Sequence, residues 1–233
     1  MTASNLLDFV LPVIAGDIDQ VARWLAADSA LATASCAAGA TRKDASAYFL
    51  EDIRHYIYEG DTLLHMAAAA FRRPVAELLV AHGADVRATN RRHAQPLHYA
   101  ADANHWDPVA QADTIHYLTS VGADPGVVDD GGTAPLHRAV RTRSLAGVKA
   151  LLDAGADPRQ ANRHGSTPLH LAVQPTGRGG SGSPRAREQQ AAIVRLLLER
   201  GARLTDRDTR GRTVRDVAVG DWIRIVLNEA LPA

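Results

Sequence analysis

Residues 167–170 read Thr-Pro-Leu-His, and this tetrad decides the fold because the chain repeats it. Related tetrads lie at residues 62–65, 95–98 and 134–137. Their histidines, His65, His98, His137 and His170, are spaced 33, 39 and 33 residues apart. A Gly-Ala-Asp or Gly-Ala-Arg turn follows each tetrad, at residues 83–85, 122–124, 155–157 and 201–203. A fixed period of this length is typical of stacked repeats that each contact only their neighbours.

Each repeat has the local chemistry of a helix pair. Threonine at the start of a tetrad can cap a helix, and the proline after it stands where a missing N–H costs nothing. A second helix is predicted by apolar residues at helical spacing, such as Val75, Leu78 and Leu79. The glycine of the following turn supplies the left-handed conformation that ends this helix.

On these residues the chain resembles the ankyrin-repeat family, from about Leu6 to Leu231. The resemblance implies an all-α ankyrin-repeat solenoid of about six helix-pair repeats including two caps. Short turns, called fingers, lead from one repeat to the next, and three insertions break the period. We expect a single domain over 1–233, with an N-terminal cap at 5–31, an insertion at 32–59, four central repeats at 60–207 and a C-terminal cap at 208–231. The C-terminal cap carries Asp216 in place of the tetrad histidine, and we expect Trp222, Ile225 and Leu227 to close it.

The three insertions differ in character. The first, 32–59, contains the aromatic segment 47–58, for which apolar residues at helical spacing predict a short amphipathic helix. The second adds six residues around Asn104–Pro108. The third, 174–187, is rich in Gly, Ser and Pro with Arg178, Arg185 and Arg187, which is typical of a flexible loop. A phosphate-binding loop is a less favoured interpretation, because no strand precedes the glycines and no Gly-Lys-Thr pattern accompanies them.

The overall charge is zero, from 26 basic and 26 acidic residues, but the two halves differ. Residues 1–116 carry a balance of −5 and residues 117–233 a balance of +5, which predicts a charge dipole along a solenoid. A single cysteine excludes an internal disulfide framework, and no apolar stretch is long enough to span a membrane. The chain has 43 alanines and only two lysines among its basic residues, which indicates a GC-rich bacterial genome. We expect a cytoplasmic protein without a signal peptide.

Of the ten histidines, four belong to the tetrads, His82 stands beside a helix-ending glycine, and five remain: His55, His93, His105, His116 and His164. For the four tetrad histidines the resemblance implies a buried role, with each ring bonded to the backbone of its own and the adjacent repeat. A second group, His55, His93 and His105 with Asp102, allows a metal-binding or acid–base hypothesis. In that hypothesis an enzyme or small-molecule pocket lies between the first insertion and the groove, and Tyr48, Tyr56 and Tyr58 also line it. The alternative, which we favour, is that these histidines are exposed or contact a partner, and no metal or other cofactor is expected.

Cys36 also has two interpretations. It has no neighbouring histidine in the sequence, so a catalytic role would need a base from elsewhere in the fold. A small buried cysteine is the simpler interpretation.

The resemblance implies a module that binds a protein partner on its concave face, through fingers and first helices. The predicted binding residues are Arg92, His93, Asp102, Trp106, Gly131, Thr133, Arg138, Arg141, His164, Ser166 and Arg212. Trp106 is the predicted anchor, unless it packs within its own insertion. The arginines either recognise carboxylates or simply reflect the preference for Arg over Lys. We expect a monomeric adaptor, or an immunity or antitoxin-like partner of a neighbouring gene product, with no membrane partner. Nucleic-acid binding by the basic half is a third, less favoured hypothesis.

Overall fold

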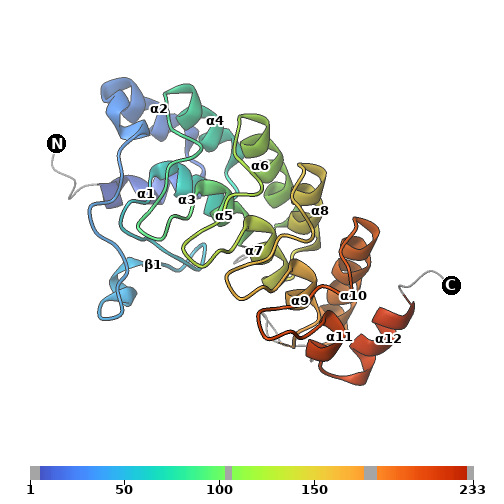
Figure 1. The fold of residues 1–233 in the computed structure, drawn as a ribbon. Coiled ribbons are helices and arrows are strands. Elements are labelled where there is room, and N and C mark those ends of the chain that lie inside the picture. Colours follow the sequence, from blue (N-terminus) through green and yellow to red (C-terminus); the bar gives the residue numbers. More distant parts are fainter. Residues whose placement is uncertain (1–5, 103–106, 176–182, 230–233) are drawn as a thin grey trace. The chain divides into compact units, whose positions relative to one another are not determined.

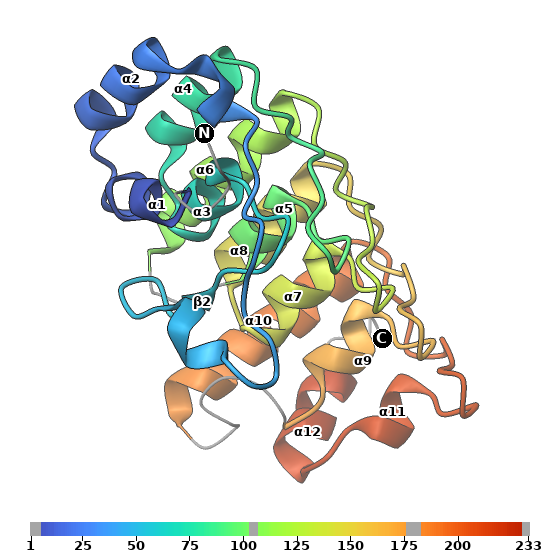
Figure 2. The same ribbon diagram turned by 90° about the vertical axis from the view of Figure 1, so that its left-hand side faces the viewer.

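The computed structural model describes residues 6–102, 107–175 and 183–229, and it divides into two compact units, residues 1–124 and 125–233. Each unit consists of helix pairs packed in sequence order (Figures 1 and 2). Among the described residues, the only strands are two of two residues each, so the predicted all-α architecture is confirmed.

In the first unit, three first helices pack in a row and three second helices pack behind them. The first helices are α1 (Leu6–Ala15), α3 (Leu63–Ala69) and α5 (Pro96–Ala101). The second helices are α2 (Ile18–Ala27), α4 (Arg73–Ala81) and α6 (Pro108–Ser120). The helix pair α1–α2 is the first pair of this unit.

The second unit repeats the arrangement. Its first helices are α7 (Pro135–Arg141), α9 (Pro168–Ala172) and α11 (Val214–Val217). Its second helices are α8 (Leu145–Asp153), α10 (Pro184–Glu199) and α12 (Asp221–Glu229). In the final pair Leu227 is buried, but Ile225 is 55% exposed, so the prediction that Ile225 closes the cap is wrong. The helical period places Ile223, Val226 and Leu227 on the inner face of α12 and turns Ile225 outward.

The tetrad histidines begin the first helices. In each tetrad the histidine Nδ1 accepts the backbone N–H of the residue three positions earlier, over 3.1–3.2 Å. Asp216 does the same with a carboxylate, whose Oδ2 accepts the Thr213 N–H at 2.7 Å. This bond satisfies one of the backbone donors that the start of a helix leaves free.

The same histidines join each repeat to the next. Because Nδ1 accepts a hydrogen bond, the proton of the neutral ring is on Nε2, which donates to a finger carbonyl of the following repeat. The acceptors lie at 3.1 Å for His65 (Ala94 O), 3.2 Å for His137 (Ser166 O) and 3.3 Å for His170 (Arg212 O). All four tetrad histidines are at most 1% exposed. The buried role that the resemblance implied is therefore confirmed for these three rings, and His98 shares their burial and their Nδ1 bond.

The first insertion does not contain the predicted helix over 47–58. A 3-10 turn, η3 (Ala45–Tyr48), leads into β1 (Phe49–Leu50), which pairs antiparallel with β2 (His55–Tyr56). Ile53, His55 and Ile57 are buried and alternate with the exposed Arg54 and Tyr56. Residues 51–54 form the turn between the two strands, and aromatic and β-branched residues on either side of it favour strands over a helix. The segment before η3 runs beside 57–61, where Ala40 N donates to Ile57 O at 2.7 Å.

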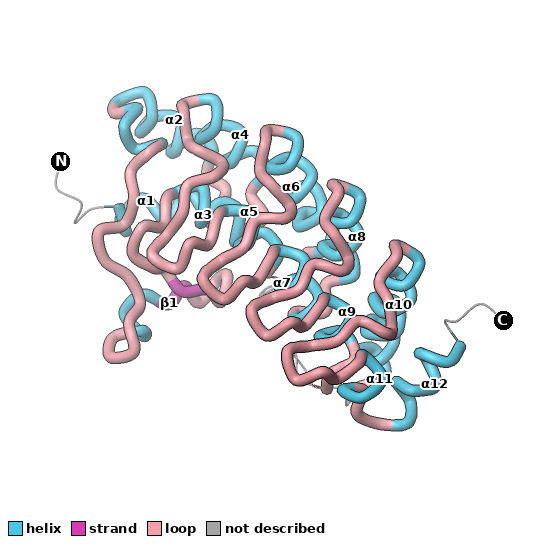
Figure 3. Tube along the Cα trace, viewed as in Figure 1, coloured by secondary structure: helices cyan, strands magenta, loops and turns pink. Residues whose placement is uncertain are grey.

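The loops and fingers project from the helices, as the loop colouring shows (Figure 3). Of the second insertion, Asn104, His105 and Trp106 lie outside the described residues, and α6 follows with Asp107 as its cap. Of the third, residues 176–182 including Arg178 also lie outside them, and α10 begins after Ser183. No helix in the described part of the chain combines the length and apolarity that crossing a membrane requires.

Candidate functional site

Each finger is organised by one side chain. Asn90, Asp129, Asn162 and Asp208 stand eight residues before the tetrad histidine or its replacement, Asp216. In each case one side-chain oxygen accepts the backbone N–H groups two and four residues further on, at 2.8–3.1 Å. Such bonds hold a turn in one conformation. These four residues are not among those predicted above, although an Asn or Asp recurs at a fixed distance from the tetrad.

Two of these fingers border a cavity in the second unit. The cavity has a volume of about 280 Å³ and lies between the fingers of residues 129–133 and 162–166 and helices α7 and α9. Its lining residues are Gly131, Thr133, His137, Arg141, Asn162, Arg163, His164 and Leu171. A cavity of this size accommodates one or two side chains of a partner.

Four of the predicted binding residues line this cavity: Gly131, Thr133, Arg141 and His164. Arg141 and His164 are exposed, so their polar groups face solvent and are available to a partner. Leu171 is half-buried and gives the cavity an apolar wall. His137 is buried, and its burial lowers the pKa of the imidazole, which keeps this wall uncharged at neutral pH.

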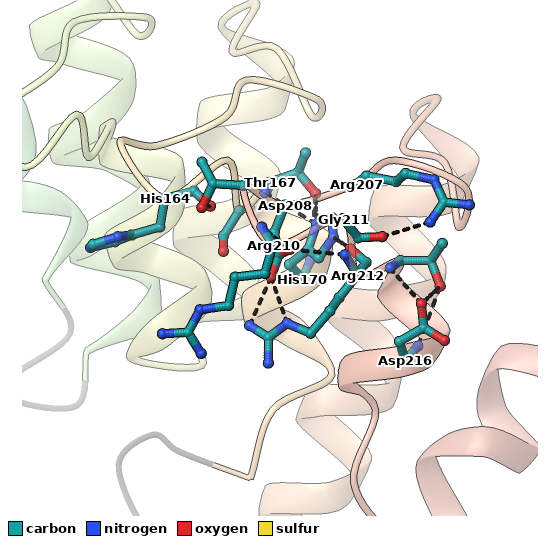
Figure 4. A network of polar contacts seen from close by, with 12 residues as sticks. His164, Thr167, His170, Arg207, Asp208, Arg210, Gly211, Arg212 and Asp216 are labelled. Atoms are coloured by element: carbon teal, nitrogen blue, oxygen red, sulfur yellow. Dashed lines mark hydrogen bonds and ion pairs between the residues drawn. The ribbon is translucent and has the colours of Figure 1, made fainter.

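Arg138 and Arg212 have intramolecular roles. Arg138 is 9% exposed, and its guanidinium lies 2.8 Å from Asp129 Oδ2. Arg212 lies 2.7 Å from Asp208 Oδ2 in the last finger (Figure 4). Burial opposes ionisation of Asp129, but Arg138 and the finger N–H groups outweigh it and lower the pKa of Asp129. Both arginines therefore stabilise fingers by neutralising the carboxylates that organise them.

Ser166 is half-buried and acts through its backbone, because its carbonyl accepts the His137 bond. Thr209 links this finger to the next, since its N–H and its hydroxyl both donate to His164 O at 3.0 Å (Figure 4 shows the neighbouring residues). The finger that carries His164 is thus fixed from both sides.

In the first unit the finger residues contact the insertion. The Arg92 guanidinium lies 5.1 Å from the ring centre of Tyr58, and that of Arg91 lies 5.6 Å from the same ring. His93 is exposed and has a φ of 54°. The equivalent positions in the other fingers, five residues before the tetrad histidine or its replacement, are all glycine. His93 therefore adopts a conformation that costs a residue with a side chain about 1–2 kcal/mol.

His55 and Asp102 are brought together by the insertion. His55 Nε2 lies 3.8 Å from Asp102 Oδ2, and the imidazole packs on the Tyr99 ring with centroids 4.4 Å apart. The two side chains are 8% and 11% exposed. The His55 side chain is therefore largely buried between the insertion and α5. His105 and Trp106, the other predicted residues of this region, lie outside the described residues.

A buried carboxylate connects the insertion to the repeats. Asp61 is 0% exposed and accepts the Tyr58 N–H at 2.7 Å, the Asn90 amide at 2.9 Å and the Tyr99 hydroxyl at 2.7 Å. Cys36 lies nearby and is buried, as the simpler interpretation predicted. Burial and the Asp61 charge raise the pKa of the Cys36 thiol to about 12. A thiol held neutral in this way is a poor nucleophile.

The described residues contain no group of three or more His, Cys, Asp or Glu side chains placed to hold a metal ion.

Comparison with known families gives two matches. A model described as "Ankyrin repeats (3 copies)" matches residues 108–208, and one described as "Ankyrin repeat" matches residues 59–91. The first match includes all residues that line the cavity, and the second ends at Arg91.

Proposed function

Because the chain belongs to the ankyrin-repeat family, whose repeats generally serve as protein–protein interaction modules, we propose that it binds a partner protein. The binding surface is the cavity of the second unit, together with the fingers and helices that border it. The fold alone does not determine the function, since one fold supports many activities.

The observation that carries this proposal is the combination of groups around the cavity. Arg141 and His164 offer exposed hydrogen-bond donors, and Leu171 offers an apolar contact at the same place. Arginine is enriched among the residues that contribute most to binding energy at protein interfaces. The fingers are also rigid, because each is organised by its own Asn or Asp. A rigid surface loses little entropy when a partner binds.

The alternative, an enzyme or small-molecule site between the first insertion and the groove, receives less support. His55 and Asp102 are close, but both side chains are largely buried, and the His55 ring packs on Tyr99. Burial of a His–Asp pair by an inserted segment is equally consistent with a structural contact.

The proposal is tested by affinity capture with three forms of the full chain: the wild type, Arg141→Glu and Arg203→Glu. Arg203 is exposed in the same unit and does not line the cavity, so its variant carries the same charge change elsewhere. We expect one protein to be retained stoichiometrically by the wild type and by Arg203→Glu, and to be lost with Arg141→Glu. Circular dichroism checks that all three forms are folded. Retention by all three forms, or capture of no stoichiometric protein at low salt, would contradict the proposal.

We further propose a monomeric, cytoplasmic protein of bacterial origin that acts as an adaptor or as an immunity or antitoxin-like partner. In that role the captured protein is the product of a neighbouring gene. Co-expression of the chain with each neighbouring gene product, followed by size-exclusion chromatography, tests this role through the appearance of a complex.

A further inference from the structure

Counting from the tetrad histidine identifies equivalent positions in different repeats. The residue four places after the histidine is Asp102 in the first unit and Arg141 in the second. Asp102 caps the end of α5, and Arg141 is the last residue of α7, where it lines the cavity beside the fingers. The same repeat position is therefore acidic in one repeat and basic in the next.

In the first unit this position already has an occupant. The insertion places a turn at residues 51–54 between its two strands, and His55 follows the turn onto α5. There the His55 ring packs on Tyr99 and its Nε2 faces Asp102 at 3.8 Å. This contact shows how a segment can bind at this repeat position. A turn places one polar side chain, His55, opposite Asp102, the residue four places after the tetrad histidine.

In the second unit the equivalent position is open. Arg141 is exposed at the cavity, and within the part of the chain that the structure describes it has no carboxylate partner. The carboxylates that organise the neighbouring fingers are already neutralised, Asp129 by Arg138 at 2.8 Å and Asp208 by Arg212 at 2.7 Å. An incoming carboxylate therefore meets an uncompensated cation.

Further cations lie on the fingers beside Arg141. Arg163 lines the cavity and is exposed, and Arg210 is exposed at the tip of the next finger. Asp130 is exposed on the finger of Gly131 but does not line the cavity. The charge that a partner meets at the cavity is thus positive.

We infer that the partner inserts an acidic segment into this cavity, with an aspartate or glutamate carboxylate opposite Arg141 and an apolar neighbour against Leu171. The inference rests on the proposed function and specifies its partner. Guanidinium groups bind carboxylates through paired hydrogen bonds, and opposite charges guide the two surfaces together. Association weakens as the salt concentration rises, because the fingers are exposed to solvent.

A random linear-peptide display library, selected at low salt against the full chain, tests this inference. We expect the wild type and Arg203→Glu to enrich peptides that contain Asp or Glu beside an apolar residue. Arg141→Glu is expected to lose these peptides. For one selected peptide, fluorescence anisotropy is expected to show at least a roughly tenfold weaker affinity for Arg141→Glu, and the same loss when its carboxylates are changed to amides.

Four results overturn the inference: enrichment of neutral or basic peptides, enrichment of none, equal binding of acidic peptides by Arg141→Glu, or tight binding only after the acidic residues are replaced by phosphoserine. Neutral peptides that are nevertheless lost with Arg141→Glu would remove the acidic segment but keep the cavity as the partner's surface. Failure of both the selection and the affinity capture to depend on Arg141 would remove the proposed function itself.

Discussion

The variant Gly165→Ala tests how much the close packing between neighbouring fingers contributes to stability. Gly165 has a φ of 70°, and a Cβ added there would lie 2.6 Å from Thr209 N and 3.0 Å from Asp208 C. These are backbone atoms of the next finger, so they cannot yield by rotating a side chain. Gly155 is the matched control, since its φ is 94° but an added Cβ meets nothing within 4 Å.

The expected losses of stability follow from this difference. A non-glycine residue in the left-handed region costs about 1–2 kcal/mol, and the smaller freedom of alanine in the unfolded chain returns about 0.4–1 kcal/mol. Gly155→Ala should therefore lower the free energy of unfolding by about 1 kcal/mol. Gly165→Ala should also displace Thr209 and break its two hydrogen bonds to His164 O, each worth about 1 kcal/mol. Its expected loss is about 3 kcal/mol.

Urea unfolding of the full chain, followed by circular dichroism and tryptophan fluorescence, measures both losses. Trp222 lies in α12 and reports on the second unit, which contains both glycines. Equal losses for the two variants would refute the argument that the fingers are held by backbone contact. A large loss for Gly155→Ala would show instead that the left-handed conformation alone dominates.

Three further predictions concern buried polar groups. His98→Ala should lower the free energy of unfolding by about 2–4 kcal/mol, because it removes a buried ring and its hydrogen bonds. His93→Ala, in an exposed finger, should change it by less than about 0.5 kcal/mol. Urea unfolding of the two variants measures both changes. Burial lowers the pKa of the His137 imidazole, so below its ordinary pKa of 6.5 the unfolded chain binds a proton that the folded chain does not. The free energy of unfolding should therefore fall on acidification by up to about 1.4 kcal/mol per pH unit. Unfolding measured at several pH values should show a shallower fall for His137→Gln. Asp61→Asn should lower the free energy of unfolding by about 3 kcal/mol, because an amide cannot accept all the bonds that the buried carboxylate accepts from Tyr58 N, Asn90 and Tyr99, and thermal unfolding measures the change.

The repeats could be predicted from the sequence because their chemistry is local. Three local patterns each predict a conformation without help from distant residues. They are a histidine three residues after a helix cap, a glycine after a helix, and an apolar residue every three or four positions. The buried role of His65, His137 and His170 followed from the tetrad for the same reason. The finger Asn and Asp residues were equally local, but their recurrence eight residues before the tetrad was overlooked.

The first insertion could not be predicted in the same way. Phe49, Ile53 and Tyr56 fit a helical spacing, but Ile53, His55 and Ile57 fit the spacing of a strand equally well. What decides between them is a contact far along the chain, because His55 packs on Tyr99 and faces Asp102. Short segments with both periods are resolved by such tertiary contacts and not by propensity.

Charge balance alone did not identify the cations that remain available to a partner. The second half of the chain has an excess of five basic residues, but Arg138 and Arg212 neutralise finger carboxylates. In the first unit, Arg91 and Arg92 pack on the Tyr58 ring of the insertion. Arg141 differs from all four because it is exposed at a cavity in the position where Asp102 meets His55. Recognition by this surface therefore depends on the charge left at one repeat position after the intramolecular contacts are made, and reversing that charge is its most direct test.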